Sequence, residues 1–464
     1  MLERYFKLGE MGTNPRTEII AGITTFVTMA YILFLNPVIL KGTGMPENVV
    51  FIATALGAGL VTLMMGLFVN FPVGLAPGMG LNAYFAIVAA SQGGAMTWQT
   101  ALGAVFVSGL IFILLTVTGF RQMLVKALPD SLKYAITVGI GLFITFIGLK
   151  LGEISTVTWL GGGPSEAAIK GGAPVTNLLF FEWNIGIANF VADKAAALTV
   201  IGLVIAGILT TLRVRGALLI GIVATTLIGI PMGVTPIENL NKVSFVPDFS
   251  NFAFGSMSLA QISSGVFWEV VIIMVFVELF DSFGTLVGTA NRAGLLNRPD
   301  GEKKLGRAMF VDGAGVSLGA LIGVTPMTAY IESAAGIESG GRTGLTAVTT
   351  GVLFLLSIFV LAPFVSVIPD AATAPALIIV GVLMMSSVRH IDWEDFGIAM
   401  PAFLTIALMP FTYSIANGIS IGIVTYVLLN GIRNIFSAKK VQVHWLMWVI
   451  AVLALARYIF LAGE

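Results

Sequence analysis

The chain has 464 residues, of which 57% are hydrophobic and 10% are charged, and its mean hydropathy is +0.98. These values lie outside the range of soluble domains and predict an all-α polytopic membrane protein, because helices satisfy their own backbone groups in lipid. The zero formal net charge gives no indication of nucleic-acid binding, and the absence of cysteine excludes disulfides, thiolate metal ligands and a cysteine nucleophile.

Apolar segments follow one another along almost the whole chain, and several reach the roughly 20 residues that a bilayer core demands. About fourteen such segments can be counted. Their centres lie near residues 29, 59, 83, 108, 140, 203, 222, 278, 314, 332, 354, 380, 404 and 426. If the N-terminus is cytoplasmic, the inside loops hold 18 of the 24 Lys and Arg residues, which supports both the orientation and the count.

The third segment is interrupted. Residues 71–90, FPVGLAPGMGLNAYFAIVAA, combine Pro and small residues with an apolar run too short to cross a bilayer alone. We expect a short extended piece that leads into a half-helix, with Asn82 in its first turn or two. The N-terminal end of a half-helix offers backbone N–H groups and a partial positive charge to a substrate. The alternative is a Pro-kinked helix that only packs.

The chain also repeats itself. LPDSLKYAITVGIGLF from Leu128 matches IPDAATAPALIIVGVLM from Ile368, and VSGLIFILL from Val107 matches TTGVLFLLS from Thr349, at offsets between 240 and 242 residues. The two halves run from about 1 to 235 and from about 262 to 437. Because seven segments in each half are an odd number, the second half is expected to lie inverted in the membrane. The alternative is chance similarity among apolar helices.

The eighth segment carries two carboxylates, Glu278 and Asp281, in the apolar run VFVELFDSFGTLVG. At bilayer depth each charge costs roughly 2.5 to 3.5 kcal/mol on insertion scales, so such acids usually face a polar cavity and bind substrate, ions or protons. On a helix the two acids lie on one face, which Ser282 and Thr285 extend by one turn. These features predict a transporter. In the alternative, the acids are hydrogen-bonded inside the bundle and serve only structure.

The tenth segment is interrupted like the third. The stretch GVTPMTAYIESAAG begins at Gly323, and its Pro326 follows Pro77 by about the repeat length. We expect Tyr330, Glu332 and Ser333 in the first turns of a second half-helix. Carboxylates accept N–H bonds and no Arg or Lys lies within these spans, so a neutral heterocycle suits the site better than an anion. Neighbouring buried acids can also load and release a proton, and proton symport is therefore our hypothesis.

The last apolar stretch, within residues 438–464, reads VHWLMWVIAVLALARYIF. It could span the bilayer, lie at the interface or pack on the bundle. We favour a peripheral tail helix.

Four stretches together resemble one family. VELFDSFGTLVGTAN, TPMTAYIESAAGIESGGRTG, GLAPGMGLNAYF and TTFVTMAYILFLNP are similar to the AzgA-like purine permeases, a branch of the nucleobase-cation symporters, and the likeness covers residues 1 to 437. The resemblance implies a proton-coupled importer of hypoxanthine, guanine or adenine. It also implies the uracil-permease fold of 14 segments in two inverted repeats, with short strands in segments 3 and 10. A core domain would comprise residues 1–120 and 262–367, and a gate domain residues 121–235 and 368–437.

The resemblance also suggests roles for single residues. Asp281 matches the segment-8 acid that contacts the base, and Glu278 the additional acid of the purine branch. Glu332 matches the segment-10 acid and Asn82 the segment-3 amide, while Ser333 stands where the uracil branch commonly has Asn. The candidate substrate-binding residues are Asp281, Glu332, Asn82, Glu278, Ser333, Tyr330, Thr328 and, as stacking aromatics, Phe280, Phe283 and Tyr84; the candidate proton-coupling residues are Glu278, Asp281 and Glu332.

Two alternatives to a purine carrier remain open from the sequence. One is a membrane-embedded enzyme with paired carboxylates, against which the absence of metal-ligand clusters argues. The other is a carrier of another small solute or of an anion on the same fold. An anion carrier would be expected to have a basic residue where this chain has Glu332. We expect the cytoplasmic (plasma) membrane as the location, the lipid bilayer, protons and a purine base as partners, and no cofactor or metal. Related carriers often dimerise, so a homodimer is a further expected partner.

Overall fold

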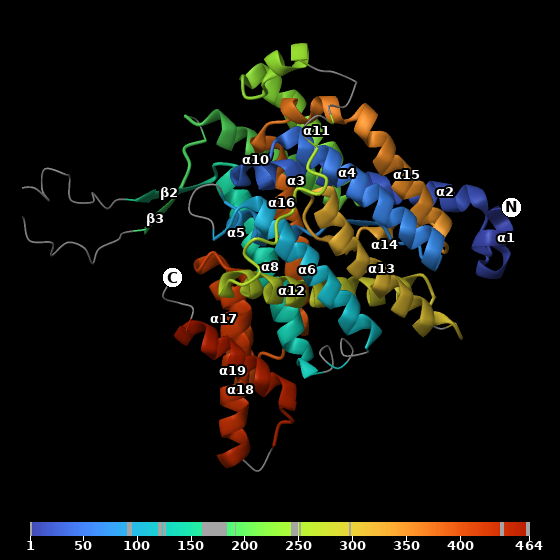
Figure 1. Cartoon of the computed structure of the whole chain (residues 1–464). Helices are drawn as coiled ribbons and strands as arrows, with labels where there is room; N and C mark the ends of the chain where they lie inside the picture. The colour runs from blue at the N-terminus through green and yellow to red at the C-terminus, as the bar shows by residue number, and fades with distance from the viewer. Residues whose placement is uncertain are drawn as a thin grey trace, which may run out of the picture.

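The computed structural model (Figure 1) describes residues 2–90, 95–118, 123, 127–159, 183–190, 192–242, 249, 252–296, 298–436 and 440–460. Among these residues, nine helices are long and apolar enough to cross a bilayer, and five shorter apolar helices accompany them. The protein is therefore a multi-pass membrane protein, as the composition predicts.

In the described part of the first half, the regular elements are helices and three short strands. Its elements are α1 (Leu2–Phe6), η1 (Gly9–Met11), α2 (Pro15–Met29), α3 (Ile32–Leu40), η2 (Lys41–Thr43), α4 (Glu47–Met64), the π-helix η3 (Met65–Val69), β1 (Leu75–Pro77), α5 (Met79–Val88), α6 (Trp98–Val117), α8 (Asp130–Leu151), β2 (Ser155–Trp159), β3 (Trp183–Ile187), α10 (Lys194–Thr211), α11 (Ala217–Met232) and η4 (Ile237–Lys242).

One further strand lies in the second half, as far as that half is described. Its elements are α12 (Gly265–Arg292), α13 (Gly301–Ile322), β4 (Met327–Ala329), α14 (Ser333–Glu338), α15 (Gly344–Val360), η5 (Ala362–Val367), α16 (Asp370–Met385), η6 (Ser386–His390), α17 (Phe396–Phe411), α18 (Ile415–Phe436) and α19 (Trp445–Phe460).

The elements up to α18 form the fourteen predicted segments, counted over the described ranges. Helices α2 and α3 together make the first segment, β1 with α5 makes the third, and β4 with α14 makes the tenth. The predicted fold class is confirmed, including the strands in segments 3 and 10. The antiparallel pairing of β2 with β3 was not predicted, and α19 lies within the predicted tail and packs against α18.

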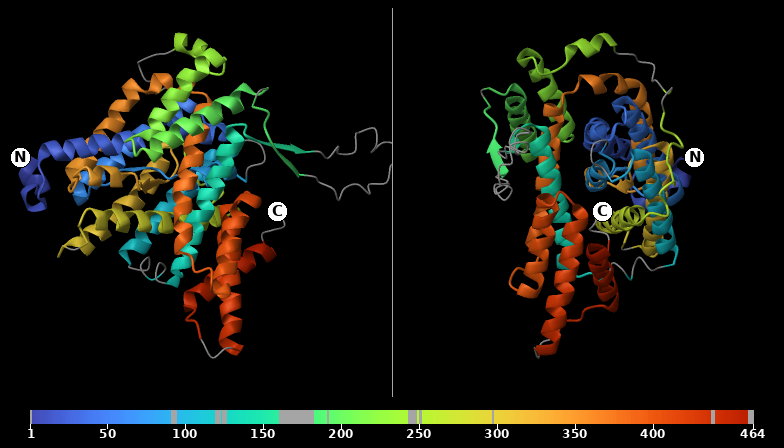
Figure 2. Two further views of the ribbon diagram at one scale, coloured as in Figure 1. Left: turned by 180° about the vertical axis from the view of Figure 1, so that it is seen from behind. Right: turned by 60° about the vertical axis from the view of Figure 1, so that its left-hand side comes forward.

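The helices gather into two packing groups. Helices α8, α10, α11, α16, α17 and α18 contact one another extensively, while α2, α4, α6, α13 and α15 make most of their contacts within a second group. The right-hand view of Figure 2 shows helices of the first group, from teal α8 to red α18, beside blue α2 and α4 and gold α13 of the second. Fewer contacts join the groups, among them those of α5 with α8 and of α3 with α16.

The two interrupted segments cross at β1 and β4, which pair antiparallel with Leu75 opposite Ala329 and Pro77 opposite Met327. Beyond the strand ends, the Gly78 amide donates to the Pro326 carbonyl at 3.0 Å. Irregular backbone inside a membrane must be hydrogen-bonded to protein, since no water is available. The crossing meets this need from both halves of the chain.

On the outer edge of each strand, side chains form hydrogen bonds with the backbone groups that the other strand does not reach. Thr62 Oγ1 of α4 accepts from the Leu75 amide at 2.9 Å and is 3.0 Å from the Leu75 carbonyl oxygen, to which it can donate. Asp312 Oδ1 of α13 accepts from the Ala329 amide at 3.1 Å. Thr62 and Asp312 lie on segments 2 and 9, which are equivalent in the two repeats. Each repeat therefore supplies one side chain to hold its own strand.

Candidate functional site

Both half-helices begin where the crossing ends. Gly78 is the N-cap of α5, and Asn82 is the fourth residue of that helix, as predicted. Glu332 is the N-cap of α14, so Ser333 is its first residue and Tyr330 precedes it. Gly78 has no room for a Cβ atom, which would meet the side chain of buried Thr328 at 2.7 Å. Thr328 therefore packs directly on the start of α5.

The carboxyl group of Glu332 meets the first segment. Tyr31, between α2 and α3, donates its hydroxyl to Glu332 Oε1 at 2.5 Å, and Thr28 Oγ1 lies 3.4 Å from the Glu332 carbonyl oxygen. Both contacts join residues that are about 300 positions apart in the chain. Tyr31 was not predicted as a site residue. A tyrosine hydroxyl in an otherwise apolar segment was the feature of the sequence that could have indicated it.

Two other predicted residues converge on one carbonyl oxygen. The Tyr330 hydroxyl donates to Pro77 O at 2.5 Å, and Asn82 Nδ2 lies 3.4 Å from the same oxygen. Asn82 is 0% exposed, and its Oδ1 finds no hydrogen-bond partner among the residues that the structure describes. Because buried polar groups are normally paired, this oxygen can accept from a donor that none of the described residues supplies.

Ser333 has a different setting. Its Oγ accepts from the Gly74 amide at 3.0 Å, and the residue is fully buried. Its hydroxyl therefore ties the start of α14 to the stretch that leads into β1.

The eighth segment passes beside the crossing, because α12 contacts α5, β4 and α14. Glu278 of this helix is 2% exposed, and its Oε1 accepts from the Ser282 hydroxyl at 2.8 Å. Phe280, Asp281 and Phe283 belong to the same helix, but their side chains lie outside the part that the structure describes. The predicted site residues whose side chains are described thus come from segments that meet at the crossing.

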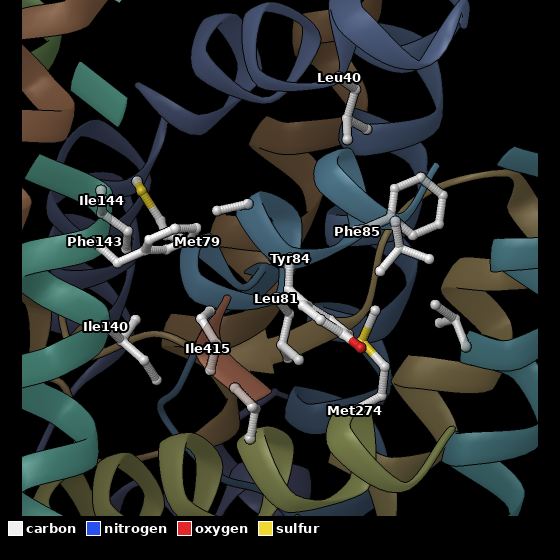
Figure 3. Close-up of a cluster of buried hydrophobic side chains, with 14 of the residues drawn as sticks. Leu40, Met79, Leu81, Tyr84, Phe85, Ile140, Phe143, Ile144, Met274 and Ile415 are labelled. Atoms are coloured by element: carbon white, nitrogen blue, oxygen red, sulfur yellow. The ribbon is translucent and has the colours of Figure 1, made fainter. Parts of the chain in front are cut away.

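Tyr84 lies in an apolar setting. Figure 3 shows its ring next to Met274 of α12, with Leu81 of α5 nearby and Ile140 of α8 across the cluster. The side chain is 5% exposed. The half-helix α5 is therefore packed between α8 and α12.

A cavity of about 490 Å³ lies elsewhere, between α12, α18 and α19. Its wall is apolar apart from Glu269 and Ser420, and it does not include Glu332, Asn82 or Glu278. Within the described ranges, no group of three or more His, Cys, Asp or Glu side chains is arranged to hold a metal ion.

A helical bundle of fourteen segments, with two broken segments that cross beside carboxyl groups, defines a membrane transporter. The model of the Permease family (Xan_ur_permease) matches residues 16–421, and the chain therefore belongs to this family. The chain is 38% identical to the guanine/hypoxanthine permease PbuG of Bacillus subtilis over 99% of this chain and 100% of that protein. It is 41% identical to the adenine permease AdeP of Escherichia coli over 92% of this chain and 90% of the relative. A membrane-embedded enzyme is thereby excluded.

Two solved structures share the fold of this chain at low sequence identity. The transmembrane domain of the cyanobacterial bicarbonate transporter BicA aligns with a TM-score of 0.61 and 15% identity, over 88% of this chain and 97% of that domain. SLC26A9 aligns with a TM-score of 0.61 and 13% identity, over 91% of this chain and 66% of that structure. These similarities show the fold alone.

Proposed function

We propose that this permease imports purine nucleobases, namely hypoxanthine, guanine or adenine, by proton symport with alternating access. The observation that carries the proposal is the position of Glu332 and Asn82 at the crossing, in a chain about 40% identical to guanine/hypoxanthine and adenine permeases. Carboxylate and amide groups offer the acceptors and donors that a purine edge requires.

In the proposed site, Glu332 and Asp281 accept N–H groups of the base. The unpartnered Oδ1 of Asn82 accepts a further N–H group. An aromatic side chain, Phe280, Phe283 or Tyr84, stacks on the ring. A base that left one of these polar groups unpaired would bind much more weakly, which is how such a site discriminates between purines.

An anionic substrate is the second candidate. Two similar solved structures are of bicarbonate and anion transporters, but they match at 15% identity or less. Glu332, with its carboxyl group at the crossing, would repel an anion. The residues of this chain therefore favour a neutral base.

We propose Glu278 as the proton carrier. A charged carboxylate is costly at a position that is 2% exposed within the membrane, whereas the protonated acid is not. A proton taken up with the base on one side and released on the other would remove and restore this charge during each cycle.

Alternating access would use the two packing groups. In this proposal, residues 1–120 and 262–367 form a core domain that carries the site, and residues 121–235 and 368–437 form the gate domain. The core moves against the gate and exposes the crossing to each side of the membrane in turn. Residence in the cytoplasmic membrane, a cytoplasmic N-terminus and a homodimer are part of the same proposal.

The test is uptake of radiolabelled hypoxanthine, guanine and adenine into proteoliposomes with and without an inward proton gradient. We expect a gradient to stimulate uptake by the parent protein. Glu332→Gln should reduce uptake about tenfold or more, because a hydrogen bond to a charged group contributes about 1.5–3 kcal/mol. The matched control is Glu338→Gln, since Glu338 lies at the exposed end of α14 and pairs there with Arg292.

Uptake by Glu338→Gln should stay within about twofold of the parent, as expected for an exposed pair. Uptake that ignores the gradient would contradict proton coupling. If well-folded protein took up no purine, the substrate assignment would be wrong.

A further inference from the structure

The first segment is broken beside Glu332. Helix α2 ends at Met29 and α3 begins at Ile32, and in the break the Leu33 amide bonds to the Ala30 carbonyl three residues earlier. Tyr31 occupies this break and is 0% exposed, packed within the largest hydrophobic cluster. The ring is therefore held by apolar neighbours, and only its hydroxyl reaches a polar group.

That polar group is the carboxyl of Glu332, 2.5 Å away. A hydroxyl that donates to a carboxylate makes a short, charge-assisted bond, which is among the stronger hydrogen bonds in proteins. Glu332 makes no side-chain capping bond to α14, so the Tyr31 hydroxyl is the side-chain contact that orients the carboxyl group.

The hydrogen bond from Tyr31 uses only one of the two carboxyl oxygens of Glu332. Tyr31 donates to Oε1, and no other residue in the described ranges donates to Oε2. Glu332 is only partly buried, whereas Tyr31 is inaccessible. The Tyr31 hydroxyl thus holds one oxygen of the carboxyl group, and none of the other described residues donates to the second.

We infer that Tyr31 is a positioning residue for substrate recognition, which fixes the Glu332 carboxyl group so that Oε2 meets an N–H group of the base. The inference rests on the proposed function. Tyr31 does not touch the base itself, because its hydroxyl is engaged by Glu332 and its ring is packed in the hydrophobic cluster. Its effect on binding passes through Glu332 alone.

A purely structural role for Tyr31 makes a different prediction. A buried hydroxyl needs a partner, and its removal could lower stability without any change in substrate affinity. A double-mutant cycle separates these roles, because only a residue that acts through Glu332 loses its effect on affinity when Glu332 is changed.

The experiment measures binding of radiolabelled hypoxanthine to purified protein in four forms: the parent, Tyr31→Phe, Glu332→Leu and the double variant. Leucine removes the acceptor of the Tyr31 hydroxyl, whereas glutamine would keep one. We expect Tyr31→Phe to raise Kd about tenfold in the parent and by less than about twofold beside Glu332→Leu. Tyr426→Phe is the control, since Tyr426 is also buried but lies on α18 away from the crossing.

An equal effect of Tyr31→Phe in both backgrounds, or a change in Tm with no change in Kd, would overturn the inference and leave the proposed function intact. Absence of purine binding by the parent would instead refute the proposed function. If Tyr31→Phe does not give monodisperse protein, Tyr31→His is compared with Tyr31→Leu, because only His can donate to the carboxyl group. We then expect the His variant to bind more tightly, and equal affinities would overturn the inference.

Discussion

The crossing of β1 and β4 and the contact between α8 and α16 are both buried, yet different forces hold them together. At the crossing the chain leaves the helix, and its backbone groups are bonded by the opposite strand, by Thr62 and by Asp312. At α8 and α16 the helices approach closely because Gly141 and Gly381 face each other. Irregular backbone in a membrane needs hydrogen-bond partners from the rest of the protein. Regular helices satisfy their own backbone groups, so their contact depends on close packing of the two surfaces.

The largest loss of stability is expected at the contact between α8 and α16, where the two helices pack closely. A Cβ atom at position 381 would overlap the carbonyl oxygen of Gly141 and the side chain of Thr145. Gly381→Val should lower the free energy of unfolding by roughly 3 kcal/mol or more, because backbone cannot move aside as a flexible side chain can. The measurement is the yield of monodisperse protein by gel filtration, followed by Tm.

Gly207→Val on α10 is the matched control, since no atom lies within 4 Å of an added Cβ there. A normal yield and Tm for Gly381→Val would mean that glycine does not set the spacing of α8 and α16.

A smaller loss of stability is expected at the crossing, where a substitution removes one hydrogen bond and creates no steric overlap. Ser333→Ala removes the acceptor of the Gly74 amide and leaves that amide unpaired. We expect the free energy of unfolding to fall by about 1–2 kcal/mol, with a lower Tm and a KM for purine within about twofold of the parent. Ser339→Ala is the control, because the Ser339 hydroxyl donates to the Ala335 carbonyl within its own turn. A large rise in KM at unchanged Tm would show that Ser333 contacts substrate after all.

The smallest effect is expected outside both regions, at exposed Glu153 just beyond α8. Partial burial, followed by the negative charges of Asp193 and Asp370, raises the pKa of Glu153 above the ordinary value of 4.5. The folded protein then binds this proton more tightly than the unfolded chain does, so stability falls as the pH rises from about 4.5 through the raised pKa.

Glu153→Gln should therefore be slightly more stable than the parent at pH 7, by less than about 1 kcal/mol for so exposed a group, and equally stable below pH 4.5. Thermal unfolding of both proteins across this range checks the sign. A variant that is less stable than the parent at pH 7 would contradict a raised pKa of Glu153 in the folded protein.

Local pattern sufficed to predict much of the crossing. Pro77 and Pro326, with small residues and short apolar runs beside them, indicated the two interruptions and their equivalence. The strands were expected at these segments and are found there. The predictions succeeded because Pro and Gly act on the backbone next to them, over a few residues.

The partners of the site residues were harder to predict. Tyr31 contacts a residue 301 positions away, and no periodicity in an apolar helix marks such a contact. Asp312 is an acid in an apolar segment, which the sequence shows. Its role is to accept a hydrogen bond from the Ala329 amide, and the direction of that amide is known only from the folded structure. Sequence patterns therefore do not predict the residues whose hydrogen-bond partners lie far away along the chain.

The crossing also imposes an order on synthesis. Leu75 leaves the ribosome 254 residues before Ala329, with which it pairs, and this delay amounts to about 10 to 50 s at ordinary rates of translation. During the delay β1 can bond to Thr62, but the edge that faces β4 lacks its partner. Lipid does not tolerate unpaired backbone, so the nascent third segment must wait in a polar setting, at the insertion machinery or the bilayer surface. Insertion of the central part of the permease is then one late event, which begins only when the second half of the chain arrives.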